Sequence, residues 1–282
     1  MSKVFVDETK CKDICQKYTD EDWTIKLLSE RYSVSRFIIT KILQENNIPI
    51  KRHTKRSGLF MKEDYFEEIN TEAKAYFLGL LFTDGNVFIR PKKTNQISLE
   101  LTIRDKDILE KFKEELNTNN KLSYRKNSNR AETVYVRFFS EKMVNDLSKY
   151  GVIPQKTKRT THLPFQLIPS QFHKDFLRGL IDGDGSIYFF GDNKKQIGLT
   201  FCSYSRNICE ELQQACDILI NQKNEHKVFT EKNKNISRVC YTKQDITKQL
   251  VTALYKDSNY YLTRKYNLAK VIFESKNEED IV

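Results

Sequence analysis

The order of apolar and polar residues divides the chain into two regions with different periods. Over residues 7–45, apolar residues recur at the three- and four-residue spacing of helices. From residue 65 onward, helical stretches are interleaved with stretches in which apolar and polar residues alternate, such as QISLELTI at 96–103. Strict alternation is typical of a strand with one buried face. The pattern predicts a small all-α domain followed by a larger α+β domain.

The N-terminal region predicts three short helices, the last two arranged as a helix-turn-helix. The polar break Ser33-Val34-Ser35 separates two helical stretches and offers N-caps. In the second stretch, RFIITKILQENN, we expect an apolar stripe formed by Phe37, Ile38, Ile42 and Leu43. The first residues of such a helix meet base edges in DNA complexes, and here they would be Ser35, Arg36, Thr40 and Lys41. The segment resembles the helix-turn-helix of resolvase-type DNA binders; a small helical cap without a ligand is the alternative.

A basic linker is expected to follow. Residues 46–58 contain Pro49, Gly58 and a cluster of cationic side chains, Lys51, Arg52, His53, Lys55 and Arg56. Such a segment can follow a DNA backbone, because its charges displace the counterions that surround the phosphates.

The larger region contains an internal repeat. The apolar segments AYFLGLLFTDG (75–85) and DFLRGLIDGDG (175–185) both end in Asp-Gly, and Asp84 and Asp184 are 100 residues apart. After each segment the pattern predicts two strands, a helix, two strands and a helix, so that each half reads αββαββα. Two such sheets side by side would form a polar saddle about as wide as a DNA duplex. An ordinary antiparallel sheet with one wetted face is the alternative.

These patterns set the predicted domain boundaries. We expect a helix-turn-helix DNA-binding domain at 1–50, a basic linker at 51–64, a first repeat at 65–164 and a second repeat at 165–282.

The two repeated motifs carry a family resemblance. FLGLLFTDG (77–85) and LRGLIDGDG (177–185) resemble the two motifs of single-chain LAGLIDADG homing endonucleases, and the resemblance covers residues 65–275. The first motif departs from the family at its sixth position, where Phe82 stands in place of the acid that the second motif keeps as Asp182. This departure implies an asymmetric enzyme, as expected for one chain that recognises a non-palindromic site.

Small residues in both motifs predict a close crossing of two helices. They stand four residues apart, at Gly79 and Thr83 in the first motif and at Gly179 and Gly183 in the second. We expect Gly85 and Gly185 to end the helices in a left-handed conformation.

This crossing would bring Asp84 and Asp184 together. Two close carboxylates at helix C-termini repel each other and oppose the helix dipole, so the arrangement requires cations. Bound Mg²⁺, with Mn²⁺ as a substitute, would activate water and stabilise the leaving oxygen in phosphodiester cleavage. A buried helix pair whose aspartates only cap turns is the alternative.

The resemblance also implies a basic residue beside each carboxylate. The candidates are Lys156 in GVIPQKTKR and Lys265 in YLTRKY, with Lys158 as an alternative to Lys156. A plain phosphate contact or a solvated lysine is as good an interpretation of these residues as a catalytic role.

Polar strand residues are the candidates for base readout: Gln96, Ser98, Thr102, Arg137, Gln196, Thr200 and Arg238. This set depends on the strand register, because a slip of one residue exchanges the two faces. Glu100 would also lie on the DNA face, where it could accept a hydrogen bond from cytosine or pair with a nearby cation.

Composition narrows the class of protein further. The chain carries a formal charge of +10, spread along its length, which favours a polyanionic partner. No stretch approaches the roughly 18 apolar residues of a membrane span and no signal peptide is visible, so we expect a soluble intracellular protein. The six cysteines include no CxxC pair and predict reduced thiols, and the four histidines show no zinc-ligand spacing.

These observations predict a monomeric, metal-dependent endonuclease for long, non-palindromic double-stranded DNA that requires no protein partner. By resemblance it would cut both strands across the minor groove and leave short 3′ overhangs. The ends show no splice junction, which predicts a free-standing or intron-encoded enzyme. An RNA maturase or a non-catalytic transcriptional regulator on the same fold is the alternative function.

Overall fold

The computed structural model divides the protein into two compact units, residues 1–58 and 59–282. It describes residues 7–19, 23, 25–50, 60–127, 130–231 and 233–274. Each unit has its own hydrophobic core. Among the described residues, no helix is long and apolar enough to cross a membrane.

The first unit is a bundle of three short helices, α1 (Glu8–Thr19), α2 (Ile25–Tyr32) and α3 (Arg36–Glu45). Ser35 begins α3 as its N-cap, because its hydroxyl accepts a hydrogen bond from the backbone N–H of Ile38. The three helices were predicted, but the position of Phe37 in the apolar stripe was wrong. Its side chain is 76% exposed, and Ile39 is buried instead. At about 100° per residue, Phe37 lies roughly 140° away from Ile42 around the helix.

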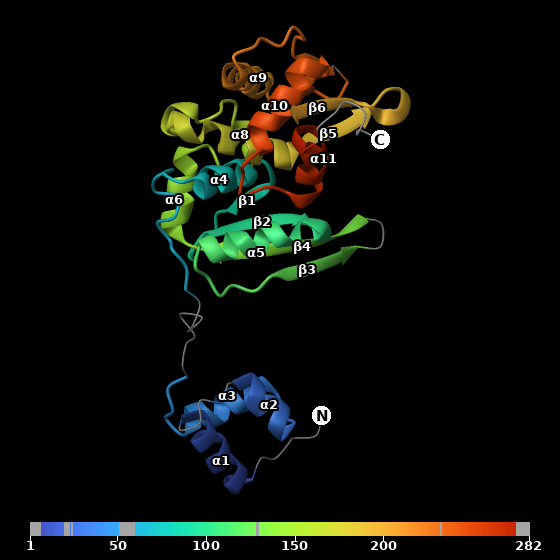
Figure 1. The fold of residues 1–282 in the computed structure, drawn as a ribbon. Helices are drawn as coiled ribbons and strands as arrows, with labels where there is room; N and C mark the ends of the chain where they lie inside the picture. The colour runs from blue at the N-terminus through green and yellow to red at the C-terminus, as the bar shows by residue number, and fades with distance from the viewer. Residues whose placement is uncertain are drawn as a thin grey trace. The chain divides into compact units, whose positions relative to one another are not determined.

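The second unit contains two four-stranded antiparallel sheets with the same strand order (Figure 1). The first sheet runs β1 (Gly85–Phe88), β2 (Gln96–Thr102), β4 (Arg130–Phe139), β3 (Ser123–Asn127). The second runs β5 (Gly185–Phe190), β6 (Gln196–Ser203), β8 (Ile236–Tyr241), β7 (Phe229–Glu231). The repeated order confirms the predicted α+β fold of two related halves.

Three helices accompany each sheet. The first half has α4 (Glu72–Asp84), α5 (Lys106–Glu115) and α6 (Glu141–Lys149). The second half has α8 (His173–Asp184), α9 (Arg206–Ile220) and α10 (Gln244–Tyr255). Two further helices, α7 (Lys156–Arg159) and α11 (Thr263–Glu274), were not predicted. The additional helices each carry one of the two lysines expected near the motif aspartates.

Helices α4 and α8 lie at the centre of the second unit, between the two sheets, as Figure 1 shows. Each sheet buries one face against helices: Ile97, Leu99 and Leu101 of β2 are buried, whereas the residues between them are partly exposed. The strand ends at Thr102, and Ile103 begins a 3₁₀ turn, so its predicted place in the alternation was wrong. One apolar core joins both halves.

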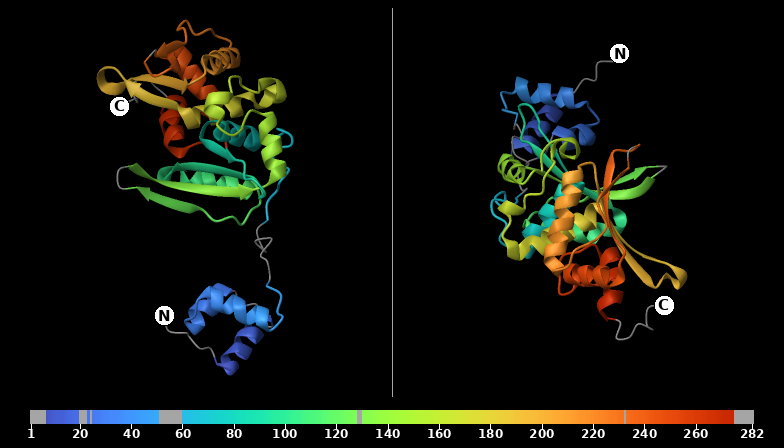
Figure 2. Two further views of the ribbon diagram at one scale, coloured as in Figure 1. Left: turned by 180° about the vertical axis from the view of Figure 1, so that it is seen from behind. Right: turned by 90° about the horizontal axis from the view of Figure 1, so that it is seen from above.

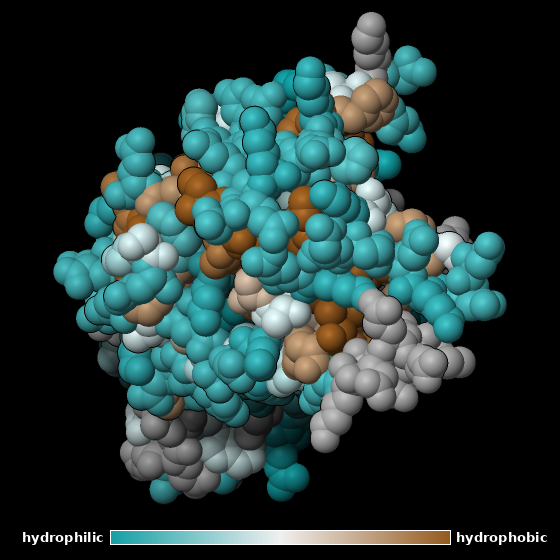
Figure 3. Space-filling view, turned by 45° about the horizontal axis from the view of Figure 1, so that its top comes forward, coloured by the Kyte–Doolittle hydropathy of each residue, from teal (hydrophilic) through white to brown (hydrophobic). Residues whose placement is uncertain are grey.

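The hairpins of the two sheets extend away from the helices in diverging directions, as the right-hand view of Figure 2 shows. On the face of the molecule drawn in Figure 3, most described residues are hydrophilic, and the apolar ones form small separate patches.

Candidate active site

The two motif helices cross at a pair of glycines. A Cβ atom on Gly79 would lie closer than 3.0 Å to backbone atoms of Phe176 and Leu180, and one on Gly179 would meet the backbone of Tyr76. Real Cβ atoms do not approach backbone atoms this closely. Glycine at both positions therefore permits α4 and α8 to pack backbone to backbone.

The next turn of the crossing is asymmetric. The Thr83 side chain fills the space in front of Gly183, where a Cβ would lie 2.5 Å from Thr83 Cβ and 2.6 Å from Asp84 Oδ2. These distances place the Asp84 carboxylate directly beside the end of α8. The Thr83 hydroxyl also lies 3.2 Å from Asp84 Oδ2 and donates to it or to a carbonyl oxygen of its own helix.

The glycines that follow the aspartates do not adopt the predicted left-handed conformation. Gly85 has φ −70° and Gly185 has φ −94°, both in the range open to any residue. Close packing requires glycine here, because a Cβ on Gly85 or Gly185 would lie within 3.0 Å of the backbone of Leu81 or Ile181. The chain passes directly from each helix into the first strand of its sheet.

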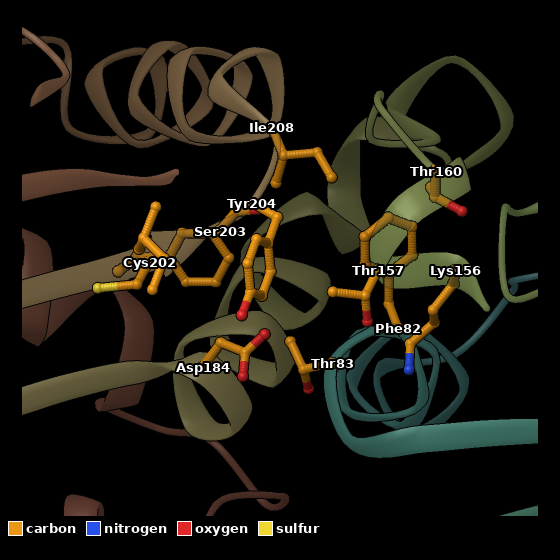
Figure 4. A pocket seen from close by; sticks show the side chains of 12 residues that line it. Phe82, Thr83, Lys156, Thr157, Thr160, Asp184, Cys202, Ser203, Tyr204 and Ile208 are labelled. Carbon is orange, nitrogen blue, oxygen red and sulfur yellow. The ribbon is translucent and has the colours of Figure 1, made fainter. Parts of the chain in front are cut away.

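Asp84 and Asp184 end the two central helices. Asp184 lines a cavity of about 330 Å³ together with Thr83, Lys156 and Tyr204, and Figure 4 shows these side chains around the cavity. Burial raises the pKa of both carboxyls, and the Asp184 charge raises that of Asp84 further, to about 6. The two lysines expected beside the aspartates oppose both shifts.

Lys156 lies in α7 and is half-buried. Its Nζ donates to the carbonyl oxygen of Gly85, the residue after Asp84. Burial lowers the pKa of Lys156, while Asp84 and Asp184 act in the opposite direction. Lys158, the alternative, is exposed.

Lys265 lies in α11 and is only 3% exposed. Its Nζ donates to the carbonyl oxygens of Ile181, Asp182 and Gly185 at 2.6, 2.7 and 2.7 Å. Burial lowers the pKa of Lys265 to about 8, and the Asp182 charge opposes this effect. The two lysines therefore occupy related places, each on the carbonyl of the glycine after a motif aspartate.

Asp182, at the sixth position of the second motif, is fully buried and accepts three hydrogen bonds. Tyr255 donates its hydroxyl to Oδ1 at 2.6 Å, and Tyr76 and the backbone N–H of Leu262 donate to Oδ2 at 2.8 and 2.7 Å. Asp182 thereby joins α4, α8, α10 and the segment before α11. Phe82 takes the same position in the first motif and packs against Phe176.

Arg178 is another buried charged group, and sequence reasoning did not single it out. Its guanidinium is fully buried and donates to the carbonyls of Tyr260 and Leu254 and to the carboxylates of Glu72 and Asp175, at 2.7 to 2.9 Å. Because Glu72 begins α4, this ion pair joins the two halves. The available signal was a charged residue between the apolar residues Leu177 and Leu180 of the motif helix.

The donor set at the helix ends fits a hard divalent cation. Two carboxylates and nearby backbone carbonyls offer only oxygen, and Mg²⁺ is commonly held by one or two carboxylates together with water and phosphate oxygens. Within the described parts of the chain, no group of three or more His, Cys, Asp or Glu side chains could hold a metal on its own. The site therefore suits an ion that the substrate helps to bind.

The candidate base-reading residues lie on strands β2, β4, β6 and β8. Ser98 pairs with Arg137 and Thr200 with Cys240, whereas Arg238 pairs with Cys202 and donates to its sulfur at 3.4 Å. The remaining candidates are Gln96 and Thr102 in β2 and Gln196 in β6.

Two features of the first sheet concern charge on its open face. The Arg137 guanidinium is exposed and lies 4.5 Å from the centre of the Tyr135 ring. Glu100 accepts hydrogen bonds from Arg125 at 3.0 Å and from Thr133 at 2.7 Å, so it pairs with a nearby cation, one of its two expected roles.

The candidate DNA contacts of the first unit surround the start of α3. Arg36 and Lys41 are exposed, and Lys41 Nζ lies 3.5 Å from Glu45. Thr40 donates its hydroxyl to the Arg36 carbonyl at 2.8 Å. The linker candidates Lys51, Arg52, Lys55 and Arg56 lie outside the described residues.

Comparison with known proteins supports the motif-based interpretation of the second half. Residues 171–254 match the model of the LAGLIDADG-like domain. The chain is also 27% identical over 207 residues to the uncharacterised protein MJ0314 of Methanocaldococcus jannaschii, covering 69% of this chain and 71% of that protein.

The chain is also similar to solved endonuclease structures. The meganuclease I-SmaMI bound to uncleaveable DNA aligns with 75% of this chain and 94% of its own, with a TM-score of 0.51 at 12% identity. The LAGLIDADG homing endonuclease I-LtrWI bound to target DNA aligns with 78% of this chain and 93% of its own, with a TM-score of 0.48 at 14% identity. The likeness to I-SmaMI shows that the chain has the fold of that meganuclease.

Proposed function

We propose that this LAGLIDADG-fold chain is a site-specific endonuclease that hydrolyses phosphodiester bonds in both strands of a DNA duplex. The observation that carries the proposal is the pair Asp84 and Asp184, which end two helices crossing at Gly79 and Gly179. Helix packing does not require two partly exposed carboxylates at this point, and burial makes their charge costly. A function that uses the charges explains why both are present.

Asp84 and Asp184 would hold Mg²⁺, and Mn²⁺ would substitute. When bound, the ion supplies a Lewis acid that activates water and neutralises the leaving oxygen. The carboxylates orient this centre, because each is fixed at the end of a rigid helix, and Thr83 restrains Asp84. Lys156 contributes a positive charge to the same cavity.

The duplex would lie across the open faces of the two sheets. Fold analogy supports this placement, since the solved meganuclease with the same fold is bound to DNA. The two candidate base-reading sets both include the first Gln of a strand, Gln96 or Gln196, and otherwise differ in sequence, which suits a long, non-palindromic target. The three-helix unit would extend the contact as a helix-turn-helix, with α3 as the recognition helix.

A randomised duplex library tests the proposal. The wild-type protein is expected to cut a subset of sequences in both strands with Mg²⁺ or Mn²⁺ and none with EDTA. Asp84→Asn and Asp184→Asn should bind the selected sequences without cutting them. Binding without cleavage by the wild type in either metal would contradict the nuclease assignment and favour a transcriptional regulator. Splicing activity in a cleavage-dead variant would add a maturase role.

Phe37 provides a test of the helix-turn-helix. An aromatic side chain that is 76% exposed on the first turn of α3 is placed to pack against thymine methyl groups in the major groove. Phe37→Ala is expected to weaken binding of a full-length target roughly tenfold, which corresponds to about 1.4 kcal/mol. Competition binding measures the change, with Gln16→Ala on α1 as an exposed control. Equal affinities of wild type and Phe37→Ala would argue against α3 as the recognition helix.

Glu100 provides a test of the sheet surface. Glu100→Gln removes the carboxylate that neutralises Arg125, which leaves the guanidinium available to a phosphate. DNA affinity at low salt is expected to rise, and the slope of log K against log salt should steepen by about one counterion. A salt titration measures both, with Asp245→Asn on α10 as the control. An unchanged slope would place Arg125 away from the DNA.

A further inference from the structure

The two active-site lysines differ in how many of their N–H donors are already hydrogen-bonded within the protein. An ammonium group has three N–H donors and no acceptor. Lys265 donates to three carbonyl oxygens within 2.7 Å, and its side chain is 3% exposed. All of its donors are therefore engaged inside the protein. It has no proton left for a phosphate oxygen or a water molecule.

Lys156 has a different environment. Among the described residues, the carbonyl of Gly85 is the acceptor of a hydrogen bond from Lys156, and the side chain lines the cavity that contains Asp184. Two of its three N–H donors are therefore available to a group that enters this cavity. In Figure 4 the Lys156 side chain extends toward the helix that carries Phe82.

The motif asymmetry explains this difference. In the second motif, Asp182 binds Tyr76, Tyr255 and the backbone of Leu262, which draws the start of α11 against α8 and inserts Lys265 among the carbonyls. In the first motif, Phe82 offers no acceptor, and the described residues form no such network around α7. Lys156 consequently remains half-buried at the edge of the cavity.

We propose that Lys156 is the single catalytic lysine, that Lys265 is a positioning residue that caps the end of α8, and that the two DNA strands are consequently cut at unequal rates. This inference rests on the proposed endonuclease function. In the cleavage step that Lys156 assists, the water oxygen forms a bond to phosphorus while the bond from phosphorus to the leaving sugar oxygen breaks. The proton that water loses balances the one that the sugar oxygen takes up, and the Lys156 ammonium donates a hydrogen bond to the phosphate without losing its proton.

The asymmetry is tested by strand-resolved kinetics on a cognate duplex labelled at both ends. Wild type is expected to accumulate a nicked intermediate. Lys156→Met should slow cleavage of one strand by about 100-fold, the usual loss for one transition-state donor, and the other by less than tenfold. A small alkylamine in solution should partly rescue Lys156→Ala. Lys149→Met, an exposed lysine on α6, is the control.

Lys265 is tested by a variant and by a spectrum that does not depend on activity. Lys265→Met should lower the melting temperature and slow the cleavage of both strands equally. No alkylamine should restore the activity of this variant, because the space around the Lys265 side chain is closed to solvent. In protein labelled with ¹⁵N-lysine, the ammonium protons of Lys265 should exchange slowly with water, since all three are bonded and buried. If Lys265→Met does not fold, this spectrum of the wild type decides the assignment.

Three results would overturn the inference. The first is equal cleavage rates of the two strands in the wild type. The second is slower cleavage of only one strand in Lys265→Met with an unchanged melting temperature, and the third is fast proton exchange at Lys265. Equal rates would leave the endonuclease proposal intact. Absence of any cleavage in Mg²⁺ and Mn²⁺ would reject the proposed function itself, and this inference with it.

Discussion

Asp84→Asn is expected to abolish cleavage and, in the absence of metal, to make the protein more stable than wild type. Loss of a carboxylate that orients the reacting centre should reduce the cleavage rate by at least ~1000-fold, or about 4 kcal/mol. Stability should change in the opposite direction because the Asp84 charge is buried beside Asp184, which raises its pKa from 3.8 to about 6. A neutral amide of similar shape removes the cost of burying the charge and its repulsion by Asp184.

The raised pKa of Asp84 also determines how the stability of the wild-type protein depends on pH. An acid with a raised pKa binds its proton more tightly in the folded state, so the free energy of unfolding falls as pH rises from about 4 to about 6. The loss amounts to roughly 3 kcal/mol and persists above pH 6. Thermal unfolding in EDTA should therefore show Asp84→Asn as the more stable protein at pH 8, and the difference should shrink toward pH 4.

Added Mg²⁺ provides the control for this prediction. The ion should raise the melting temperature of wild type, because it binds the folded state, and should have little effect on Asp84→Asn. A variant that is less stable than wild type at pH 8 in EDTA would show that neither burial nor Asp184 makes the Asp84 charge unfavourable in the folded protein.

Gly179→Ala is expected to disrupt the central helix crossing. The new methyl group would meet three backbone atoms, the carbonyl of Tyr76, the Cα of Gly79 and the amide of Leu80, at 3.0 Å or less. Backbone cannot move aside as a side chain can, so the two helices must separate. We expect the free energy of unfolding to fall by about 3 kcal/mol or more, at the upper end of overpacking effects. The melting temperature should fall by roughly 6–12 °C. Cleavage should fall as well, because Asp84 and Asp184 lie one turn beyond the crossing.

Gly198→Ala is the matched control. The three atoms nearest to a methyl group at Gly198 in β6 all belong to the Tyr188 side chain, the closest at 2.5 Å, and that side chain can rotate. The same chemical change should therefore cost much less here. If both variants melt at the wild-type temperature, the close contact of α4 and α8 is not essential to the fold.

Much of the architecture could be predicted from the sequence because each helix and strand of the first half has a counterpart in the second half. The αββαββα order and both crossing glycines follow from the pattern around Asp84 and Asp184. The register of β2 was also predictable, since one face of the strand is buried. Helix α7 was missed because its four residues are too short for a periodic pattern. Helix α11 was missed because the repeat ends at the third helix of each half, although Tyr266, Ala269 and Phe273 have helical spacing.

The errors have a local and a tertiary source. Phe37 was assigned to the apolar stripe, although helix geometry places it about 140° from Ile42, and its side chain is exposed. Gly85 and Gly185 are required by a close contact and adopt an ordinary φ. The different roles of the two lysines depend on Asp182, whose partners are contributed by three separate segments. A single sequence does not reveal such convergence.

The contact of Thr83 with Gly183 also determines which halves can pair. The crossing has room for one side chain at the seventh motif position, and Thr83 occupies it. Two copies of the first repeat, brought together in the same geometry, would place two threonines in that space and could not close. Two copies of the second repeat would bring glycine against glycine and meet no such obstacle. This contact therefore disfavours one of the two possible symmetric assemblies, the pair of first repeats, and is compatible with the unlike pair present in the chain.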